Sequence, residues 1–397
     1  ANGCLIPKHL FEQYTGAKSR EAPWNLKPVG TGPYKFKTFT PGDLVEGVIN
    51  TDYHQPNRPY FDAIQMKGGG DATSAARAVL ETGEYDYAWN LQVEDQLLKK
   101  MEAQGKGRVR FTKGANLEHI EINFTDPDKV VDGERSSIKT THPTLSDPAV
   151  RQALSLLVDR AGVQQYIYGR TGETTANYLN GPPQYVSRDT KWEYNIQKAI
   201  DILDKAGWKP GSGGIREKDG KKLSYLFQTS INQSRQETQQ IVKQACRKAG
   251  IDLRLKAVLA SVFFSSDTGN DDTYPKFYAD LQMYTVNPTN PDPAFFMRNF
   301  LSSEVAAKAN RWQGRNITRW RNADYDRIYA ETQKELDPVK RAALFIQLND
   351  LVIKNLVVIP VIFRKSVSGT INGLHAPLSG WDNDTWDLPD WFMEARA

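Results

Sequence analysis

Three consecutive segments decide the fold: LSYLFQT at residues 223–229, SRQETQQIVKQACRKAG at residues 234–250 and IDLRLK at residues 251–256. The first is a short, largely apolar run and the third alternates apolar and charged residues, so both are predicted strands. The middle segment has apolar residues at helical spacing, a capping-box pattern from Ser234 to Glu237 and a glycine at its end. Strand, helix and strand in this order predict a βαβ unit with parallel strands and a right-handed crossover.

Helical and strand patterns alternate along the rest of the chain. Apolar residues recur at helical spacing in residues 195–206, and Asp147–Pro148 is typical of an N-cap followed by a helix-starting proline. A long helix at residues 337–354 precedes an apolar strand at 356–363. Further strands are predicted at 35–39, 44–50, 61–66, 85–90, 108–112, 119–124 and 278–284, and a further helix at 72–82. These patterns predict an α/β chain of at least two lobes.

The composition excludes several classes of protein. The 397 residues carry 51 basic and 47 acidic side chains, so the net charge of +4 gives no case for nucleic-acid binding. The longest apolar run, residues 356–363, is too short for a transmembrane helix. Cys4 and Cys246 are too few for a metal cage, and whether they pair stays open. The chain starts without an initiator methionine or a signal region, so we expect a removed leader or a longer precursor.

No motif identifies a cofactor or a metal site, and none is expected. Gly30 and Gly32 lack the third glycine and the following helix of a dinucleotide-binding turn. The five histidines lie far apart, and no His-x-x-x-His pair occurs. No Gly-x-Ser-x-Gly motif supports serine hydrolase chemistry. A carboxylate pair for glycoside hydrolysis stays open, because 47 acidic residues guarantee some close pairs.

The strongest candidate for a binding segment is MYTVNPTNPDPAFF at residues 283–296. Its three prolines limit the backbone entropy that is lost on ordering. Its asparagine, threonine, aspartate and tyrosine side chains offer hydrogen-bond donors and acceptors at the end of a predicted strand, which suits recognition of a polar small molecule. A rigid connecting loop is the alternative interpretation.

A set of ordered motifs resembles a known family. The motifs are VGTGPY (29–34), NTDY (50–53), PYFD (59–62), LETGEYD (80–86), NF (123–124), DPAVRQAL (147–154), AIDILDKAGW (199–208) and NPDP (290–293). Together they resemble the extracellular solute-binding proteins of peptide, opine and nickel ABC transporters, over essentially the whole chain. Members of that family usually begin with a further long stretch, so the chain resembles a fragment that lacks part of the first lobe.

The resemblance implies a type II-like, two-lobed periplasmic-binding-protein fold of the large peptide-binding subclass, with mixed sheets and a two-strand hinge. Lobe I would comprise residues 1–119 and 361–397, and lobe II residues 120–360, closing over the solute. The implied function is non-enzymatic: a periplasmic receptor, expected to be monomeric, delivers a small solute to ABC permease subunits. Whether it is free or lipid-anchored stays open.

Candidate ligand-binding residues follow from this alignment. Lobe I would supply Trp89 as a stacking platform and Asn90 as a hydrogen-bonding group. The candidates from lobe II and the C-terminal loop are Tyr284, Asn287, Asn290, Trp381 and Trp386, together with Arg298 and Arg364 for an anionic group. Core burial is the alternative role for the two tryptophans of the C-terminal loop.

One departure from the family bears on the solute. Peptide binders of the family place an aspartate for the ligand's α-amino group where this chain has Thr289. A buried ammonium without a charge partner is costly, so an opine, a sugar-containing solute or another polar conjugate is favoured over a peptide. A hydrolase with a carboxylate pair acting on a glycoside or amide, and a scaffold relative that binds no solute, are the alternatives.

Overall fold

The computed structural model describes residues 5–395, which divide into two compact units. Of the described residues, unit 1 comprises 5–91, 99–110 and 367–395, and unit 2 comprises 92–98 and 111–366. Cys4, whose pairing the sequence leaves open, lies outside the described residues, and Cys246 is a buried free thiol. Across residues 5–395, no helix combines the length and the hydrophobicity needed to cross a membrane.

Unit 2 is built on a mixed sheet in the order β11-β10-β12-β5-β13. β11 and β12 each run parallel to β10, whereas β12 pairs antiparallel with β5. The short β6 adds to β13. The strands are β5 (Gly107–Ile122), β6 (Gly172–Thr174), β10 (Ser224–Ser230), β11 (Asp252–Val258), β12 (Leu281–Val286) and β13 (Val358–Ile371).

The predicted βαβ unit is confirmed, with one correction at the helix start. β10 and β11 are parallel in continuous register and are joined by α7 (Gln233–Lys248). The helix begins earlier than the capping-box pattern indicates, because the Asn232 side chain accepts the hydrogen bond from the Arg235 N–H. Ser234 therefore lies inside the helix, where it is buried. The true cap is an asparagine, a residue that serves equally well at this position.

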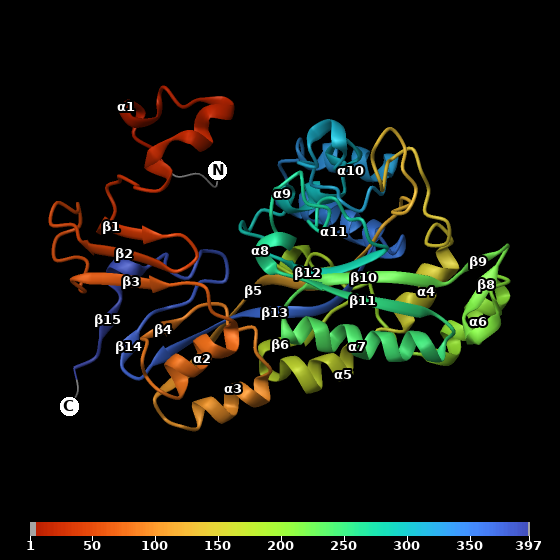
Figure 1. Ribbon diagram of the computed structural model, residues 1–397, viewed down its shortest axis with the longest axis horizontal. Coiled ribbons are helices and arrows are strands. Elements are labelled where there is room, and N and C mark those ends of the chain that lie inside the picture. Colours follow the sequence, from red (N-terminus) through yellow and green to blue (C-terminus); the bar gives the residue numbers. More distant parts are fainter. Residues whose placement is uncertain (1–4, 396–397) are drawn as a thin grey trace. The chain divides into compact units, whose positions relative to one another are not determined.

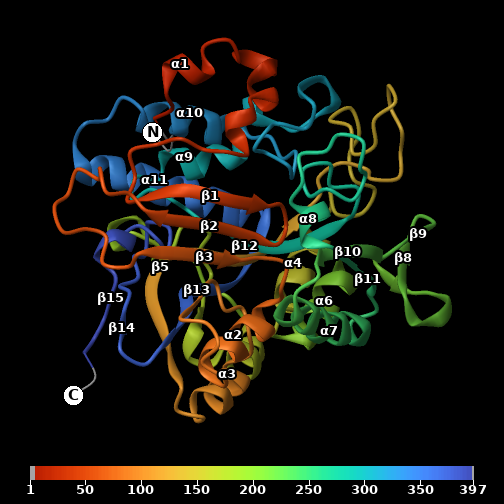
Figure 2. The same cartoon turned by 60° about the vertical axis from the view of Figure 1, so that its left-hand side comes forward.

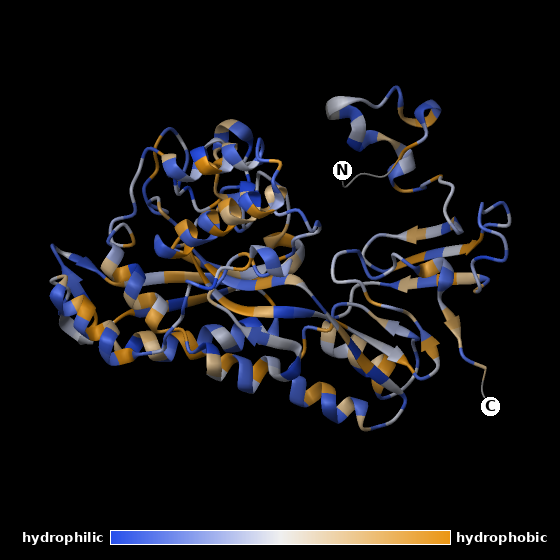
Figure 3. Ribbon diagram, turned by 180° about the vertical axis from the view of Figure 1, so that it is seen from behind, coloured by the Kyte–Doolittle hydropathy of each residue, from blue (hydrophilic) through white to orange (hydrophobic). Residues whose placement is uncertain are grey.

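Helices cover both faces of the sheet in unit 2 (Figures 1 and 2). One core lies between the strands and the helices α4 (Pro148–Leu156), α5 (Arg160–Val163), α6 (Ile196–Lys205) and α7. The second core packs α9 (Ala294–Met297), α10 (Ala323–Thr332) and α11 (Pro338–Lys354) against β5 and β13. Figure 3 shows hydrophobic residues along the strands of this sheet, where both faces are buried.

Smaller elements complete unit 2. α8 (Ala260–Phe263) follows β11 and packs in a third apolar cluster with Tyr284. Asp219 and Gly220 form the turn between β8 (Arg216–Lys218) and β9 (Lys221–Lys222), and β7 (Lys209–Pro210) pairs with β8.

Unit 1 contains a three-stranded antiparallel sheet with helices and two short pairings. The sheet order is β1-β2-β3. The elements are α1 (Lys8–Phe11), β1 (Tyr34–Thr40), β2 (Leu44–Ile49), β3 (Ala63–Lys67), α2 (Ala72–Leu80), β4 (Tyr87–Ala88), β14 (Leu374–His375) and β15 (Phe392–Met393). The chain changes unit within α3 (Asp95–Glu102), and again within the long strands β5 and β13.

Four predicted strands differ clearly in length from the strands of the structure. The two strands expected at 108–112 and 119–124 are one continuous strand, β5. The strand expected at 356–363 extends through residue 371 as β13. The strand expected at 85–90 is reduced to the two residues of β4, because it pairs with β13 only at Gly369 and Thr370.

Candidate functional site

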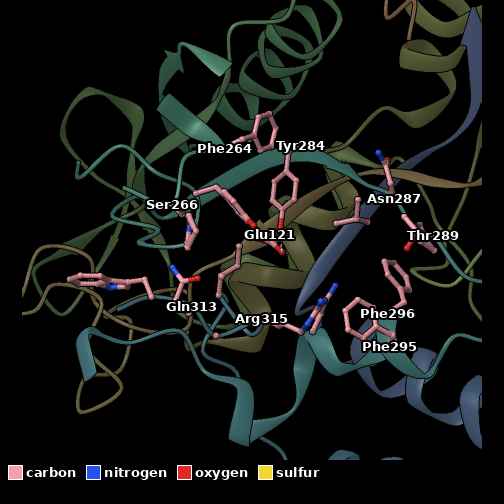
Figure 4. A pocket seen from close by; sticks show the side chains of 18 of the residues that line it. Glu121, Phe264, Ser266, Tyr284, Asn287, Thr289, Phe295, Phe296, Gln313 and Arg315 are labelled. Carbon is pink, nitrogen blue, oxygen red and sulfur yellow. Dashed lines mark hydrogen bonds between the residues drawn. The ribbon is translucent and has the colours of Figure 1, made fainter. Parts of the chain in front are cut away.

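A cavity of about 390 Å³ opens within unit 2 at the ends of β5 and β12. Its walls come from the segment after α8, from the loop between β12 and α9, and from residues 312–317. Figure 4 shows side chains from all of these segments around the same space. The sequence therefore brings residues nearly two hundred positions apart to one place, because β12 lies beside β5 in the sheet.

The pleat of β5 decides which side chains face the cavity. Successive residues of a strand point to opposite faces. Ile120 and Ile122 pack in the core under α7, so Leu117, His119 and Glu121 point to the opposite side. On β12 the same alternation directs Gln282 and Tyr284 toward Glu121.

Glu121 is a buried carboxylate at one wall of the cavity. The Tyr284 hydroxyl donates a hydrogen bond of 3.0 Å to its Oε1, and Gln282 Nε2 donates one of 2.9 Å to its Oε2. His119 Nε2 lies 3.4 Å from Oε1. A carboxylate offers about four lone-pair sites, so Glu121 keeps acceptor capacity toward the cavity.

His119 lies behind Glu121 and is fully buried. Its ring makes edge contacts with Tyr178 and Tyr284, at centroid distances of 5.7 and 4.9 Å. Within residues 5–395, neither ring nitrogen has a hydrogen-bond partner. The ring therefore acts mainly as an aromatic spacer that supports Tyr284.

Burial and a neighbouring charge together determine the protonation state of the Tyr284 hydroxyl. Burial is the larger cause that raises the pKa of Tyr284 well above its usual value, and the neighbouring Glu121 raises it further. The hydroxyl therefore stays protonated at neutral pH and remains a donor to Glu121.

The loop between β12 and α9 is held by its own side chains. Asn290 Oδ1 accepts a hydrogen bond from the Asp292 N–H, and Asp292 Oδ1 accepts one from the Ala294 N–H. Asp292 Oδ2 also lies 2.9 Å from Arg341 Nη1 on α11. Burial on its own would raise the pKa of Asp292, but the Arg341 hydrogen bond holds it below its usual value. These bonds fix the loop, so Asn287 and Thr289 are presented at defined positions.

Arg315 forms another wall of the cavity. Its guanidinium carbon lies 3.7 Å from the centre of the Phe295 ring. Its Nη1 donates a hydrogen bond of 3.4 Å to Asn299 Oδ1, and Asn299 in turn donates to the Tyr178 hydroxyl at 3.0 Å. The guanidinium is therefore stacked on an aromatic face and oriented on one edge.

The predicted residues of unit 2 divide into two groups. Tyr284, Asn287 and Asn290 all line the cavity. Arg298 lies outside the cavity lining and pairs with Glu304. Arg364 is buried, with its Nη1 3.7 Å from Glu118 Oε1.

The predicted residues of unit 1 lie in loops. Trp89 follows β4 and is 68% exposed. Asn90 follows it with a φ of 51°, a left-handed conformation that asparagine tolerates. In the C-terminal loop Trp381 is half-buried and Trp386 is 48% exposed. Their roles in binding stay predictions.

Sequence reasoning missed Glu121, Tyr274 and Arg315. Glu121 could be recognised only from the pairing of β5 with β12, which a single sequence does not reveal. Arg315 lies in an irregular segment without a periodic pattern. Tyr274 lies in a loop outside the predicted binding segment, whereas Phe295, on α9, belongs to that segment; both line the cavity.

The charged groups of the cavity support binding more readily than hydrolysis. Two carboxylates line it, and one of them, Asp292, is committed to Arg341. Among the residues that the structure describes, no cluster of three or more histidine, cysteine or acidic side chains could hold a metal ion. The remaining arrangement can offer an acceptor at Glu121, a cation at Arg315 and amide groups between them.

The chain belongs to the bacterial extracellular solute-binding proteins of family 5, whose middle-region model matches residues 5–308. The oligopeptide-binding protein AppA of Bacillus subtilis is 29% identical over 262 residues, which are 64% of this chain and 44% of that protein. The glutathione-binding protein GsiB of Salmonella paratyphi A is 22% identical over 369 residues, 91% of this chain and 64% of that protein. The chain thus spans less than two thirds of the length of these relatives.

Solved structures confirm the expected fold class. AppA of Bacillus subtilis, solved in complex with a nonapeptide, superposes with a TM-score of 0.80 at 22% identity, covering 98% of this chain and 72% of that one. NikZ of Campylobacter jejuni, solved with Ni(L-His), gives a TM-score of 0.78 at 22% identity, covering 97% and 72%. The family model describes solute-binding proteins, which agrees with the expectation that the chain is not an enzyme.

Proposed function

We propose that this chain is the solute-binding component of an ABC importer, binding a polar small solute and delivering it unchanged to the permease. The observation that carries the proposal is the cavity of unit 2, in a chain that belongs to the solute-binding family. The cavity combines aromatic walls with a few polar groups that can fix the orientation of a ligand. The exposed Asn287 and Asn290 and the half-buried Arg315 are polar groups of the lining that we propose contact the solute.

The solute is proposed to be a peptide, an opine or a sugar conjugate. The printed names of AppA and GsiB, an oligopeptide binder and a glutathione binder, support a peptide-like solute. Thr289 in the place of the aspartate supports an opine or a sugar conjugate, as the sequence alone indicates. Glu121 lies on another wall of the same cavity. Its carboxylate could accept a hydrogen bond from a donor group of the solute.

The contacts are proposed to involve both units. Tyr284, Asn287 and Asn290 would contact the solute from unit 2, and Trp89 and Asn90 from unit 1. The large exposed fraction of the Trp89 indole, 68%, supports a role in stacking. Trp381 is proposed as a further contact. Binding to both units would favour a closed form that permease subunits recognise.

We propose the cellular location and the protein partners from the family to which the chain belongs. Its description as extracellular supports a location in the periplasm or on the cell exterior. We propose that the receptor acts as a monomer and that its protein partners are the permease subunits.

The proposal is tested with the purified chain and a panel of short peptides, an opine and an amino acid–sugar conjugate. Calorimetry and thermal unfolding should reveal at least one solute that binds and raises the melting temperature. Mass spectrometry of the recovered solute should show it unaltered, whereas cleavage would favour a hydrolase. Asn287→Ala should weaken binding, while Gln197→Ala, which removes an exposed amide on α6, should not. Failure of every solute to bind would contradict the proposal.

A further inference from the structure

Arg315 lines the cavity, and two arginines that contact lining residues, Arg298 and Arg341, already have a carboxylate partner. Arg298 pairs with Glu304, and Arg341 pairs with Asp292. No ion pair among residues 5–395 includes Arg315, although its guanidinium lies in the cavity wall. Arg315 is therefore a half-buried cation whose charge the protein leaves unneutralised.

The guanidinium is oriented as a binding group would be. One face of its plane rests on Phe295, at 3.7 Å from the ring centre, and Asn299 accepts a hydrogen bond from Nη1. Figure 4 shows Arg315 beside Phe295 within the cavity. Stacking restricts the side chain before any ligand arrives, so less conformational entropy is lost on binding. The remaining N–H groups form a planar fork that matches a carboxylate.

The rest of the cavity makes this cation the natural partner of an anion. Glu121 provides a negative charge, but hydrogen bonds from Tyr284 and Gln282 hold its carboxylate against the strands. Burial is the main cause that raises the pKa of Tyr274; Glu121 raises it further, whereas Arg315 lowers it. The cavity thus has a positive pole at Arg315 and a negative pole at Glu121.

We propose that Arg315 binds a carboxylate of the solute, and that the cavity selects solutes that carry an anionic carboxylate together with a hydrogen-bond donor for Glu121. This inference rests on the proposed function and narrows it. It excludes neutral sugars and solutes whose carboxylates are all blocked. It holds for a peptide with a free carboxylate and for an opine, because both carry the required groups.

The experiment compares each probe as the free acid and as the matched amide. The probes are alanine peptides of increasing length and octopine, and binding is measured by calorimetry. Losing a charge-assisted hydrogen-bond pair should weaken binding of the amides by roughly tenfold to a hundredfold. Arg315→Gln should weaken binding of the acids to a similar extent and remove most of the difference between acid and amide. Arg315→Lys keeps the charge but loses the fork, and should bind the acids with intermediate affinity.

Arg311→Gln is the matched control. It makes the same change of charge four residues earlier in the same segment, at an exposed side chain that does not line the cavity. Its affinities should equal those of the unaltered chain, and thermal unfolding should show that every variant is folded. If acids and amides bind the unaltered chain equally, or if Arg315→Gln binds the acids normally, the inference is wrong while the proposed function stands. If no probe binds the unaltered chain, the inference fails, whereas the proposed function fails only if the amino acid–sugar conjugate does not bind either.

Discussion

Arg235 of α7 and Glu118 of β5 form a buried, two-point ion pair beneath the sheet. Arg235 Nη2 lies 3.0 Å from Glu118 Oε1, and Nε lies 3.1 Å from Oε2. Glu118 points to the face of β5 that α7 covers. Glu121, three residues further along the strand, points to the opposite face. Arg364 of β13 approaches the same carboxylate at 3.7 Å. The helix of the βαβ unit is thus tied by charge to β5, and the same carboxylate ties β5 to β13.

Removing Arg235 should destabilise unit 2 strongly. Arg235→Met would leave the Glu118 carboxylate buried with only the more distant Arg364, and an uncompensated buried charge costs about 3–5 kcal/mol. Because Arg364 compensates in part, we expect a loss near the lower end, about 3 kcal/mol. Urea unfolding measures this loss as a shift of the midpoint.

Arg327→Met is the control for that measurement. Arg327 pairs with Glu331 at 2.7 Å on α10, but both side chains are largely exposed. Exposed pairs contribute about 0–1 kcal/mol, so the midpoint should hardly move. Equal effects of the two substitutions would show that the buried pair has no special role.

The stability of unit 2 should fall in acid because of Glu118. Burial on its own would raise the pKa of Glu118, but the charge and hydrogen bonds of Arg235, aided by Arg364, hold it below the usual value. A carboxyl group with a lowered folded-state pKa stabilises the fold above its unfolded pKa, which is about 4.3 for glutamate. This contribution is lost as the pH falls from there through the lowered pKa. Urea midpoints measured between pH 7 and pH 3 should show the decline.

Glu118→Gln separates this effect from general acid sensitivity. The variant is less stable at neutral pH, because two buried guanidinium groups lose their counter-charge. Its stability should nevertheless fall less steeply in acid than that of the unaltered chain, since the titrating group is gone. Identical slopes would assign the acid dependence to other carboxylates.

Local patterns were sufficient to predict the βαβ unit and the N-cap of one helix. Asp147 caps α4 as expected, whereas Asn195, predicted inside its helix, is the N-cap of α6. Strand length was predicted poorly, because it depends on neighbours in the sheet. Polar residues around Lys113 interrupt the apolar pattern, yet β5 continues through them beside β13. Conversely, β4 ends where its short pairing with β13 ends.

The candidate site was predictable only in part. Composition and spacing drew attention to the loop that carries Asn287 and Asn290, and both residues line the cavity. Partners across the sheet and between distant loops are properties of the tertiary structure. Glu121 and Arg315 could not be recognised without it, and Arg298 could not be distinguished from Arg315 by residue type.

Tyr284→Phe should cost about 1 kcal/mol of stability through the loss of one hydrogen bond. The ring would keep its packing against His119 and Phe263, at centroid distances of 4.9 and 6.1 Å. Glu121 would keep the bond from Gln282. Thermal unfolding should therefore show a lower melting temperature. Tyr274→Phe is the control, because its hydroxyl forms no hydrogen bond within residues 5–395, and its melting temperature should hardly change.

Trp89→Ala should weaken solute binding without unfolding the chain. The indole is 68% exposed, so its removal takes little buried surface from the fold, whereas loss of a stacked aromatic anchor weakens binding by about 1–3 kcal/mol. Calorimetry with a solute identified from the panel measures the change in affinity. Tyr166→Ala removes an aromatic side chain that is similarly exposed, 67%, in unit 2, and should leave the affinity unchanged. Unchanged affinity of Trp89→Ala would remove Trp89 from the site and leave the cavity of unit 2 as the binding surface.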